Sequence, residues 1–284
     1  MGRWCCPIAE GARILRFRGP GCRGAPPAAL TGFERRTNTP RIFPGLGTEM
    51  SDSAPTLDDF VSDLFSRPDM LRMGHGQRLE DRNLGLGWLY YALGRVLRPA
   101  RAVVIGSYRG FVPGVIARAL LENQEGGEVH FVDPSLADDF WSDPGAVASH
   151  FEGLGTPNVR HHRHTTQSFV ETEAFAQLDG VGLLMVDGLH TAQQAGFDYQ
   201  SFLPKLTPDA VTLFHDSTIR RTSTFYGDDR AYEHSVCDLM ERIRADAGLE
   251  LFTLPVASGL SMVRGRPADP EALFAPFPEP GVQE

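Results

Sequence analysis

Apolar residues in the first part of the chain recur at helical spacing, starting near residue 56. Thr56 and Asp59 form a capping pattern three residues apart. The apolar series that follows, with spacings of three and four, is Leu57, Phe60, Val61, Leu64 and Phe65. A second helical stretch covers about residues 84–97. We therefore predict that residues 50–98 form cover helices.

From residue 101 onward, short apolar runs alternate with amphipathic stretches. The predicted strands cover residues 101–106, 128–133, 158–163, 181–187 and 210–215, and the predicted helices cover residues 113–123, 145–152, 168–177, 192–203 and 229–246. Such alternation is typical of a parallel sheet with helices on both faces. Two closing strands, 249–253 and 260–263, are joined by a short turn and form a hairpin. The expected fold is α/β and Rossmann-like, a doubly wound, seven-stranded, mostly parallel sheet with one antiparallel edge strand.

The two ends of the chain differ in composition from this body. Residues 1–49 carry eight arginines against three acidic residues, a net charge of +5, and 14 of them are Gly or Pro. We expect this segment to be disordered. It is either a targeting peptide or a non-native leader before a true start at Met50, and we favour the leader. The Pro-rich residues 267–284 are expected to be a flexible tail.

The body after residue 49 is acidic, with 19 basic and 33 acidic residues and a net charge of −14. This charge argues against nucleic acid or an anionic membrane as a partner. Cys237 is the only cysteine of the body and no apolar run is long enough to span a bilayer, so a cytoplasmic location is the simplest. Lys205 is the only lysine of the chain, which excludes a P-loop. The sequence is compatible with a homo-oligomer.

Ligands of open α/β sheets bind at the carboxyl ends of the strands, so the residues there are the candidate site. A glycine turn, Gly106 to Gly110, follows the first strand and leads into a helix, where amides favour an anionic group. It is either a cofactor loop or a plain tight turn. Asp133 ends the second strand, where a carboxylate can accept both ribose hydroxyls; the alternative is a helix cap.

Acidic and imidazole side chains follow the fourth and fifth predicted strands. Asp187 and His190 come after the fourth strand, and His215 and Asp216 come after the fifth. We expect them to meet at one rim of the sheet, either as a hard-cation site with a base nearby or as a structural polar cluster. Asp198 either orients His190 or faces solvent.

The order of these motifs resembles the class I S-adenosylmethionine (SAM)-dependent methyltransferases. The resemblance covers about residues 84–265 and is most specific in residues 183–216, which contain the D-G-x-H motif, the segment FDYQSFLPKLTPDAVTLFHD and its terminal HD pair. It is closest to the small-molecule O-methyltransferase-like subgroup. The resemblance implies a SAM-binding methyltransferase domain over residues 99–266.

The resemblance also implies roles for individual residues. The loop around the methionine portion of SAM corresponds to Gly106, Ser107, Tyr108 and Gly110. Asp133 corresponds to the acid that holds the ribose, and Asp187 to the acid next to cofactor and substrate.

In metal-dependent relatives, acids at the positions of Asp187 and Asp216 help to hold a magnesium-like ion. The resemblance therefore implies a Mg²⁺ site at Asp187, Asp216 and His215 and a catalytic group of Asp187, His190 and His215, with either His190 or His215 as the general base. The predicted function is SAM-dependent methyl transfer to an oxygen of a small-molecule substrate.

Two alternatives stay open at this point. An inactive nucleoside-binding scaffold is suggested by Val104, which replaces the usual acid, and by His164 to Gln167 at the third strand end. The other alternative is a hydroxylase-like relative. We also expect residues 217–229 to be a substrate lid or a surface loop, and Trp88, Tyr90 and Tyr91 to be core or pocket wall.

Overall fold

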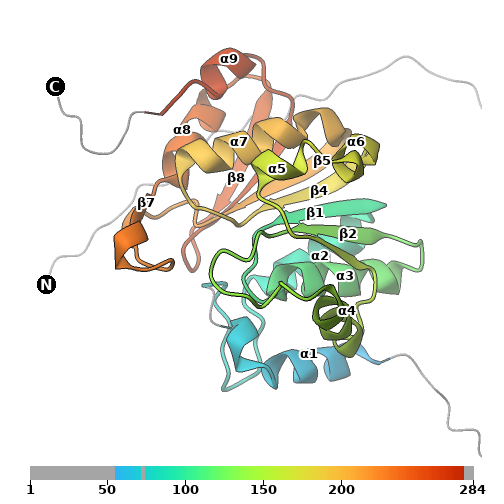
Figure 1. The fold of residues 1–284 in the computed structure, drawn as a ribbon. Coiled ribbons are helices and arrows are strands. Elements are labelled where there is room, and N and C mark those ends of the chain that lie inside the picture. Colours follow the sequence, from blue (N-terminus) through green and yellow to red (C-terminus); the bar gives the residue numbers. More distant parts are fainter. Residues whose placement is uncertain (1–54, 72–73, 278–284) are drawn as a thin grey trace, which may run out of the picture. The chain divides into compact units, whose positions relative to one another are not determined.

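A computed structural model describes residues 55–71 and 74–277 of the chain (Figure 1). The predicted leader, residues 1–49, lies outside these described residues, as do residues 278–284 of the predicted tail. Of the helices that the structure does describe, none combines the length and the apolar character that crossing a bilayer requires.

A seven-stranded sheet forms the centre of the described fold, in the order β3-β2-β1-β4-β5-β9-β8. The strands are β1 (Arg101–Ile105), β2 (Glu128–Val132), β3 (Val159–His162), β4 (Val181–Val186), β5 (Leu206–His215), β8 (Leu249–Leu254) and β9 (Leu260–Gly265). The first five pair in parallel, whereas β9 runs antiparallel to both β5 and β8. The predicted doubly wound α/β sheet with its closing hairpin is confirmed.

Helices cover both faces of this sheet (Figure 1). One face carries α1 (Leu57–Phe65), α2 (Gly87–Leu97), α3 (Phe111–Asn123) and α4 (Pro144–Gly153). The other carries α5 (Thr166–Phe169), α6 (Glu173–Gln177), α7 (Ala192–Phe202), α8 (Val236–Ala245) and α9 (Pro270–Leu273). Short 3₁₀ turns lie at η1 (Pro68–Leu71), η2 (Leu203–Lys205) and η3 (Asp228–Arg230).

Alternation along the central strands explains the two cores. In β1, Ala102 and Val104 pack into the core beneath α1 to α4, whereas Val103 and Ile105 pack into the opposite core. Successive side chains of a strand point to opposite faces, so a strand covered on both faces is apolar throughout. The predicted start of α1 is also confirmed, because Thr56 and Asp59 form a complete capping box.

Two predicted helices were wrong in extent. Residues 168–177 form two short helices rather than one, because Thr165 and Thr172 each cap a new start by accepting a backbone N–H. Residues 229–246 begin with strand β7 (Tyr232–His234), which pairs with β6 (Arg221–Ser223) in a separate hairpin before α8 begins.

Part of the predicted tail is packed, contrary to expectation. Helix α9 is capped by Asp269, and Leu273 is buried against the α7 and α8 side of the sheet. Arg242 donates hydrogen bonds to the carbonyl oxygens of Leu273 and Ala275. These contacts hold the chain against α8 as far as the described residues extend.

Candidate functional site

A cavity of about 400 Å³ opens at the carboxyl ends of β1, β2, β4 and β5. Residues directly after all four strands line it, as parallel strands ending at one edge require. The cavity therefore lies where the sequence predicted the site.

The glycine turn after β1 forms one wall of this cavity. Gly106 has a φ of 72°, and a Cβ atom on it would lie 2.5 Å from the carbonyl oxygen of Asp187. Only glycine allows β1 and β4 to come this close at their ends. The next two residues, Ser107 and Tyr108, also line the cavity.

Gly110 has a different place from the one predicted for it. Among the described residues that line the cavity, Gly110 is absent. It caps α3 with a φ of 81°, and an added Cβ would lie 2.9 Å from a ring carbon of Phe151. Its position is explained by packing of the α3 start against α4.

Asp133 lies where the sequence predicted it, on the cavity wall after β2. Its carboxylate accepts hydrogen bonds from the backbone N–H of Ser135 at 2.8 Å and of Ser107 at 3.4 Å. Burial raises the pKa of Asp133 to about 6, although these two bonds oppose the shift. The carboxylate is thus held in a fixed orientation with further lone pairs free to accept.

The end of β3 contributes a polar wall. His164, Thr165, Thr166 and Gln167 line the cavity. The Gln167 amide donates to Gln194 at 2.8 Å.

Asp198 completes this wall. Gln194 donates to the Asp198 carboxylate at 2.7 Å. Burial raises the pKa of Asp198 to about 6. Asp198 therefore neither faces solvent nor contacts His190 in any hydrogen bond or ion pair of the described residues, which corrects both expectations for it.

The predicted acid and imidazole groups after β4 and β5 do meet. The Nδ1 atom of His215 lies 2.8 Å from Oδ1 of Asp187 and 3.7 Å from Oδ1 of Asp216. His190 joins them, with its Nε2 atom 3.6 Å from Oδ2 of Asp216. All three residues predicted to hold a cation, and both predicted bases, belong to this one cluster.

Two further histidines complete the cluster. His75, from the segment before α2, places Nε2 3.5 Å from Oδ2 of Asp187. His234, at the end of β7, places Nδ1 2.9 Å from Oδ2 of Asp216. Sequence reasoning missed both residues. The only local signal for His75 is its position between Gly74 and Gly76, and none marks His234.

The charges of the cluster are strongly coupled. Burial raises the pKa of Asp187, while the facing His215 opposes that shift. Burial disfavours a charge on His215, but the carboxylate of Asp187 outweighs it and raises the pKa of His215. For Asp216, burial is outweighed by His234 and His190, which hold its pKa well below the usual range.

Only part of the cluster faces the cavity. His190, His234, Asp187 and Asp216 line it, whereas His75 and His215 lie behind the lining and are 1% and 2% exposed. Burial lowers the pKa of His190 to about 3, so its imidazole is neutral at pH 7. Of the two predicted bases, His190 is the one that lines the cavity.

The predicted lid residues form a wall of the cavity near this cluster. Arg221, Phe225 and Tyr226 lie on or between β6 and β7 and line the cavity. The ring of Phe225 contacts Tyr108 of the glycine turn edge to face, with ring centres 5.4 Å apart. This contact links the hairpin to the glycine turn.

The aromatic residues before β1 separate into core and surface. Tyr90 is fully buried and its hydroxyl lies 3.1 Å from Nδ1 of His75, whereas Trp88 is 40% exposed. Of these aromatic residues, Tyr90 contacts the cluster through His75, and it does not line the cavity.

Comparison with known proteins relates part of the chain to a family of methyltransferase domains. Residues 103–217 match the family model of a methyltransferase domain. They contain the glycine turn, Asp133 and the acids and histidines after β4 and β5, but not His75, His234 or the β6–β7 hairpin. This part of the chain is similar to a methyltransferase domain. The glycine turn, Asp133 and the DGxH and HD motifs thus occupy strand ends within the segment that matches a methyltransferase domain.

Solved methyltransferases share this fold. The O-methyltransferase TomG from Streptomyces achromogenes, in complex with SAM, superposes with a TM-score of 0.52 at 16% identity, over 74% of this chain and 91% of that one. An O-methyltransferase from Bacillus cereus, in complex with SAH, gives 0.51 at 14% identity, over 76% and 94%.

A curated relative is similar in sequence. An uncharacterized protein of Sinorhizobium fredii is 31% identical over 134 residues, which are 47% of this chain. The chain covers only 14% of the length of that relative.

Proposed function

We propose that this methyltransferase domain transfers the methyl group of SAM to an oxygen atom of a small-molecule acceptor. The observation that carries the proposal is that one cavity contains both Asp133, suited to a ribose, and His190, suited to remove a proton from a hydroxyl. The SAM-bound and SAH-bound O-methyltransferases of the same fold support it.

The residues on the cofactor side of the cavity fit SAM. The oriented carboxylate of Asp133 can accept hydrogen bonds from both ribose hydroxyls. Gly106 leaves its wall without a side chain, so a ligand can approach the backbone of the turn. When bound, SAM supplies a methyl group made electrophilic by its sulfonium.

The residues on the other side can prepare the acceptor. His190 takes the proton of the acceptor hydroxyl, and the oxygen lone pair then forms the new bond to the methyl carbon as the carbon–sulfur electrons return to sulfur. His190 has this role because its imidazole lines the cavity, whereas His215 is turned toward Asp187 behind the wall. We assign His215 to the positioning of Asp187.

The acceptor is proposed to be small because of the walls around it. The β6–β7 hairpin brings Arg221, Phe225 and Tyr226 to the cavity. A space of about 400 Å³ suits a metabolite-sized ligand, and aromatic walls are common in such sites.

The methyl transfer proposed here does not use Mg²⁺. Mg²⁺ prefers a shell of oxygen ligands, and the cluster surrounds its two carboxylates with four imidazoles. Assistance by Mg²⁺ at Asp187, Asp216 and His215 stays a prediction.

Binding and turnover of SAM test the proposal. Titration calorimetry of the full chain with SAM and with its demethylated product is expected to give saturable heats for both. Incubation with SAM and a panel of phenols, sugars and carboxylates is then expected to add one methyl group to a hydroxyl-bearing member, detected by product mass. Absence of binding to either ligand would falsify the proposal. Binding without transfer to any acceptor would favour the inactive nucleoside-binding scaffold.

The affinity for SAM is expected to depend on pH through Asp133. Its pKa of about 6 means that the carboxylate is ionised at pH 7 and becomes protonated as the pH falls, so it loses the ability to accept two ribose hydroxyls. Affinity should therefore be full above the pKa and fall about 10-fold between pH 7 and pH 5. Calorimetry across this range measures it.

Two variants test whether this pH dependence comes from Asp133 or from Asp198, the other acid of the cavity whose pKa burial raises to about 6. Asp133→Asn should bind SAM more weakly at pH 7 and show a flat profile, while Asp198→Asn should keep the slope. A slope that survives in Asp133→Asn would assign the titration to another group.

A further inference from the structure

The β6–β7 hairpin brings a cationic side chain to the acceptor side of the cavity. Arg221, the first residue of β6, lines the cavity, and its side chain is 58% exposed. Its Nη2 atom lies 3.5 Å from Oδ2 of Asp216. Within the described part of the chain, the guanidinium of Arg221 has no other hydrogen bond or ion pair. Most of its N–H donors are therefore free to bind a ligand.

The other arginine of the cavity wall is already engaged. Arg109 donates to both carboxylate oxygens of Asp138, at 3.2 and 2.5 Å. Its guanidinium also stacks against the rings of Tyr108 and Phe140, and its side chain is only 12% exposed. Among the described arginines that line the cavity, Arg221 is thus the one with donors left for an anion.

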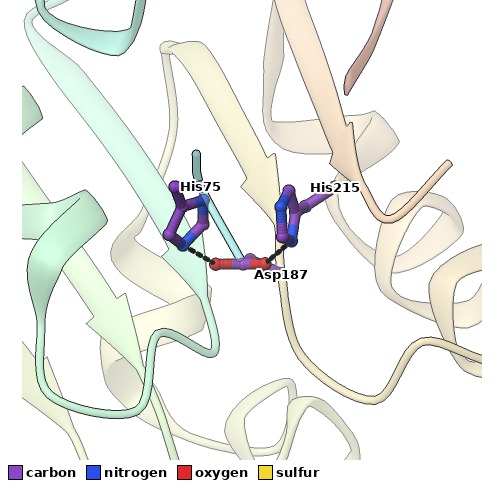
Figure 2. Close-up of side chains that lie close together, drawn as sticks. All are labelled: His75, Asp187 and His215. Carbon is purple, nitrogen blue, oxygen red and sulfur yellow. Dashed lines mark ion pairs between the residues drawn. The ribbon is translucent and has the colours of Figure 1, made fainter. Parts of the chain in front are cut away.

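The two carboxylates of the neighbouring cluster have imidazole partners of their own. Figure 2 shows Asp187 between His75 and His215, with Oδ2 3.5 Å from Nε2 of His75 and Oδ1 2.8 Å from Nδ1 of His215. Oδ2 of Asp216 lies 2.9 Å from Nδ1 of His234, which is closer than the guanidinium of the hairpin. These acids therefore do not depend on the arginine to be paired.

The oxygen shared by several of these contacts fixes how far Arg221 lies from the proposed base. Nη2 of Arg221 is 3.5 Å from Oδ2 of Asp216, and Nε2 of His190 is 3.6 Å from the same oxygen. Two such sides of a triangle limit the distance between the two nitrogens to about 7 Å. One small molecule can therefore reach both, with a hydroxyl at His190 and an anionic group at Arg221.

The rest of the hairpin lines the cavity with aromatic rings. The ring centres of Phe225 and Tyr226 lie 5.0 Å apart, and those of Tyr226 and Tyr232 lie 6.0 Å apart. Tyr232 in turn stacks on His234, with ring planes 16° apart. A row of rings at these distances favours a flat aromatic ligand, which can add stacked or edge-to-face contacts.

We propose that the methyl acceptor is a hydroxylated aromatic carboxylic acid, whose carboxylate binds Arg221 while its hydroxyl meets His190. This acceptor class rests on the proposed function. Arg221 lies outside residues 103–217, so the family model does not assign it. The planar fork of an arginine binds a carboxylate through two parallel hydrogen bonds, and this geometry selects a carboxylate over a neutral group.

The carboxylate takes no part in the transfer. The new bond joins the hydroxyl oxygen to the methyl carbon, the carbon–sulfur electrons return to sulfur, and the hydroxyl proton goes to His190. The products are a methyl ether that keeps its carboxylate, and SAH.

Calorimetry with matched ligands tests the anion site. The probes are ortho-, meta- and para-hydroxybenzoate and the corresponding hydroxybenzamides, which differ in charge but little in shape. With the full chain saturated with SAH at neutral pH, at least one acid is expected to bind about 10-fold more tightly than its amide. The preference should shrink as salt is raised, because Arg221 is more than half exposed. Equal affinity of every acid and its amide, or no binding of any acid, overturns the proposal.

Two arginines that are adjacent in sequence assign the preference. Arg221→Gln should bind acid and amide alike, whereas Arg221→Lys should keep part of the preference, because an ammonium retains the charge without the planar fork. The matched control is Arg220→Gln, since Arg220 pairs with Glu233 and Asp238 and is not among the described residues that line the cavity. A preference for the acid that survives in folded Arg221→Gln refutes the assignment.

Turnover distinguishes acceptor binding from an effect on the base. Arg221→Gln is expected to raise KM for the preferred acid about 10-fold while kcat changes less than about threefold. A fall in kcat with KM unchanged would mean that Arg221 acts on His190 through Asp216, and that result contradicts a role in holding the carboxylate.

Parallel titrations separate this proposal from methyl transfer itself. The acids are also titrated without SAH, and SAM is titrated alone. Binding of SAM and transfer to neutral phenols, with no preference for an acid, refutes the acceptor class alone. Binding of an acid that depends on Arg221, in a protein that does not bind SAM, refutes the methyl transfer and leaves the carboxylate site in place.

Discussion

Replacement of Asp133 by alanine is expected to weaken SAM binding by at least about 100-fold. The carboxylate can accept both ribose hydroxyls, and two hydrogen bonds to a charged group contribute about 3 kcal/mol or more together, which corresponds to that factor. Titration calorimetry at pH 7, where Asp133 is ionised, measures the loss.

The fold should tolerate this replacement. Because burial raises the pKa of Asp133, its ionised form destabilises the folded state at pH 7, so removing the charge should leave the thermal midpoint unchanged or raise it. Asp179→Ala is the matched control, since that exposed carboxylate pairs with Arg101 at the surface. Equal SAM affinity of Asp133→Ala and Asp179→Ala would show that the ribose is not held at Asp133.

Replacement of His190 by alanine is expected to lower kcat by about 10²–10⁴-fold, because that is the rate contribution of a general base. SAM affinity should stay within about twofold. His190 lines the cavity beside Asp216, and its proposed role is on the acceptor rather than on the ribose, so its loss should affect turnover and not SAM binding. Steady-state turnover with the acceptor found in the mass screen, together with calorimetry, measures both quantities.

The control for this experiment is His162→Ala, which removes an imidazole outside the cavity and should leave turnover unchanged. His190→Gln keeps hydrogen bonding but cannot take up a proton, so it should be as slow as His190→Ala. Full activity of His190→Gln would reduce His190 to a hydrogen-bonding role. If His190→Ala instead lost SAM binding but turned over bound SAM at the normal rate, the roles assigned to both Asp133 and His190 would be contradicted.

The buried strands were the most predictable part of the fold. β4 and, after Arg101, β1 lack polar side chains because both of their faces are covered, and such runs are visible in any single sequence. Asp133 and Asp187 could be placed for the same reason, since each directly follows an apolar run that must end at the carboxyl edge of the sheet.

Short elements with weak cores were predicted less well. The β6–β7 hairpin has three residues in each strand, and its polar sequence resembles a loop followed by the start of α8. Helices α5 and α6 have four and five residues, and their separation depends on the caps at Thr165 and Thr172. Elements of this length are stabilised by packing and capping rather than by periodicity.

The sequence by itself determined the α/β order of the chain and the acids and histidines at three strand ends, because hydrophobic periodicity and the carboxyl-edge rule act locally. Only the tertiary structure decided that His75 and His234 join Asp187 and Asp216, since these residues come from segments far apart in the chain. It also decided that His190 faces the cavity while His215 lies behind it. The direction of a side chain depends on the packing of neighbouring elements, and that packing exists only once the sheet and its covers have assembled.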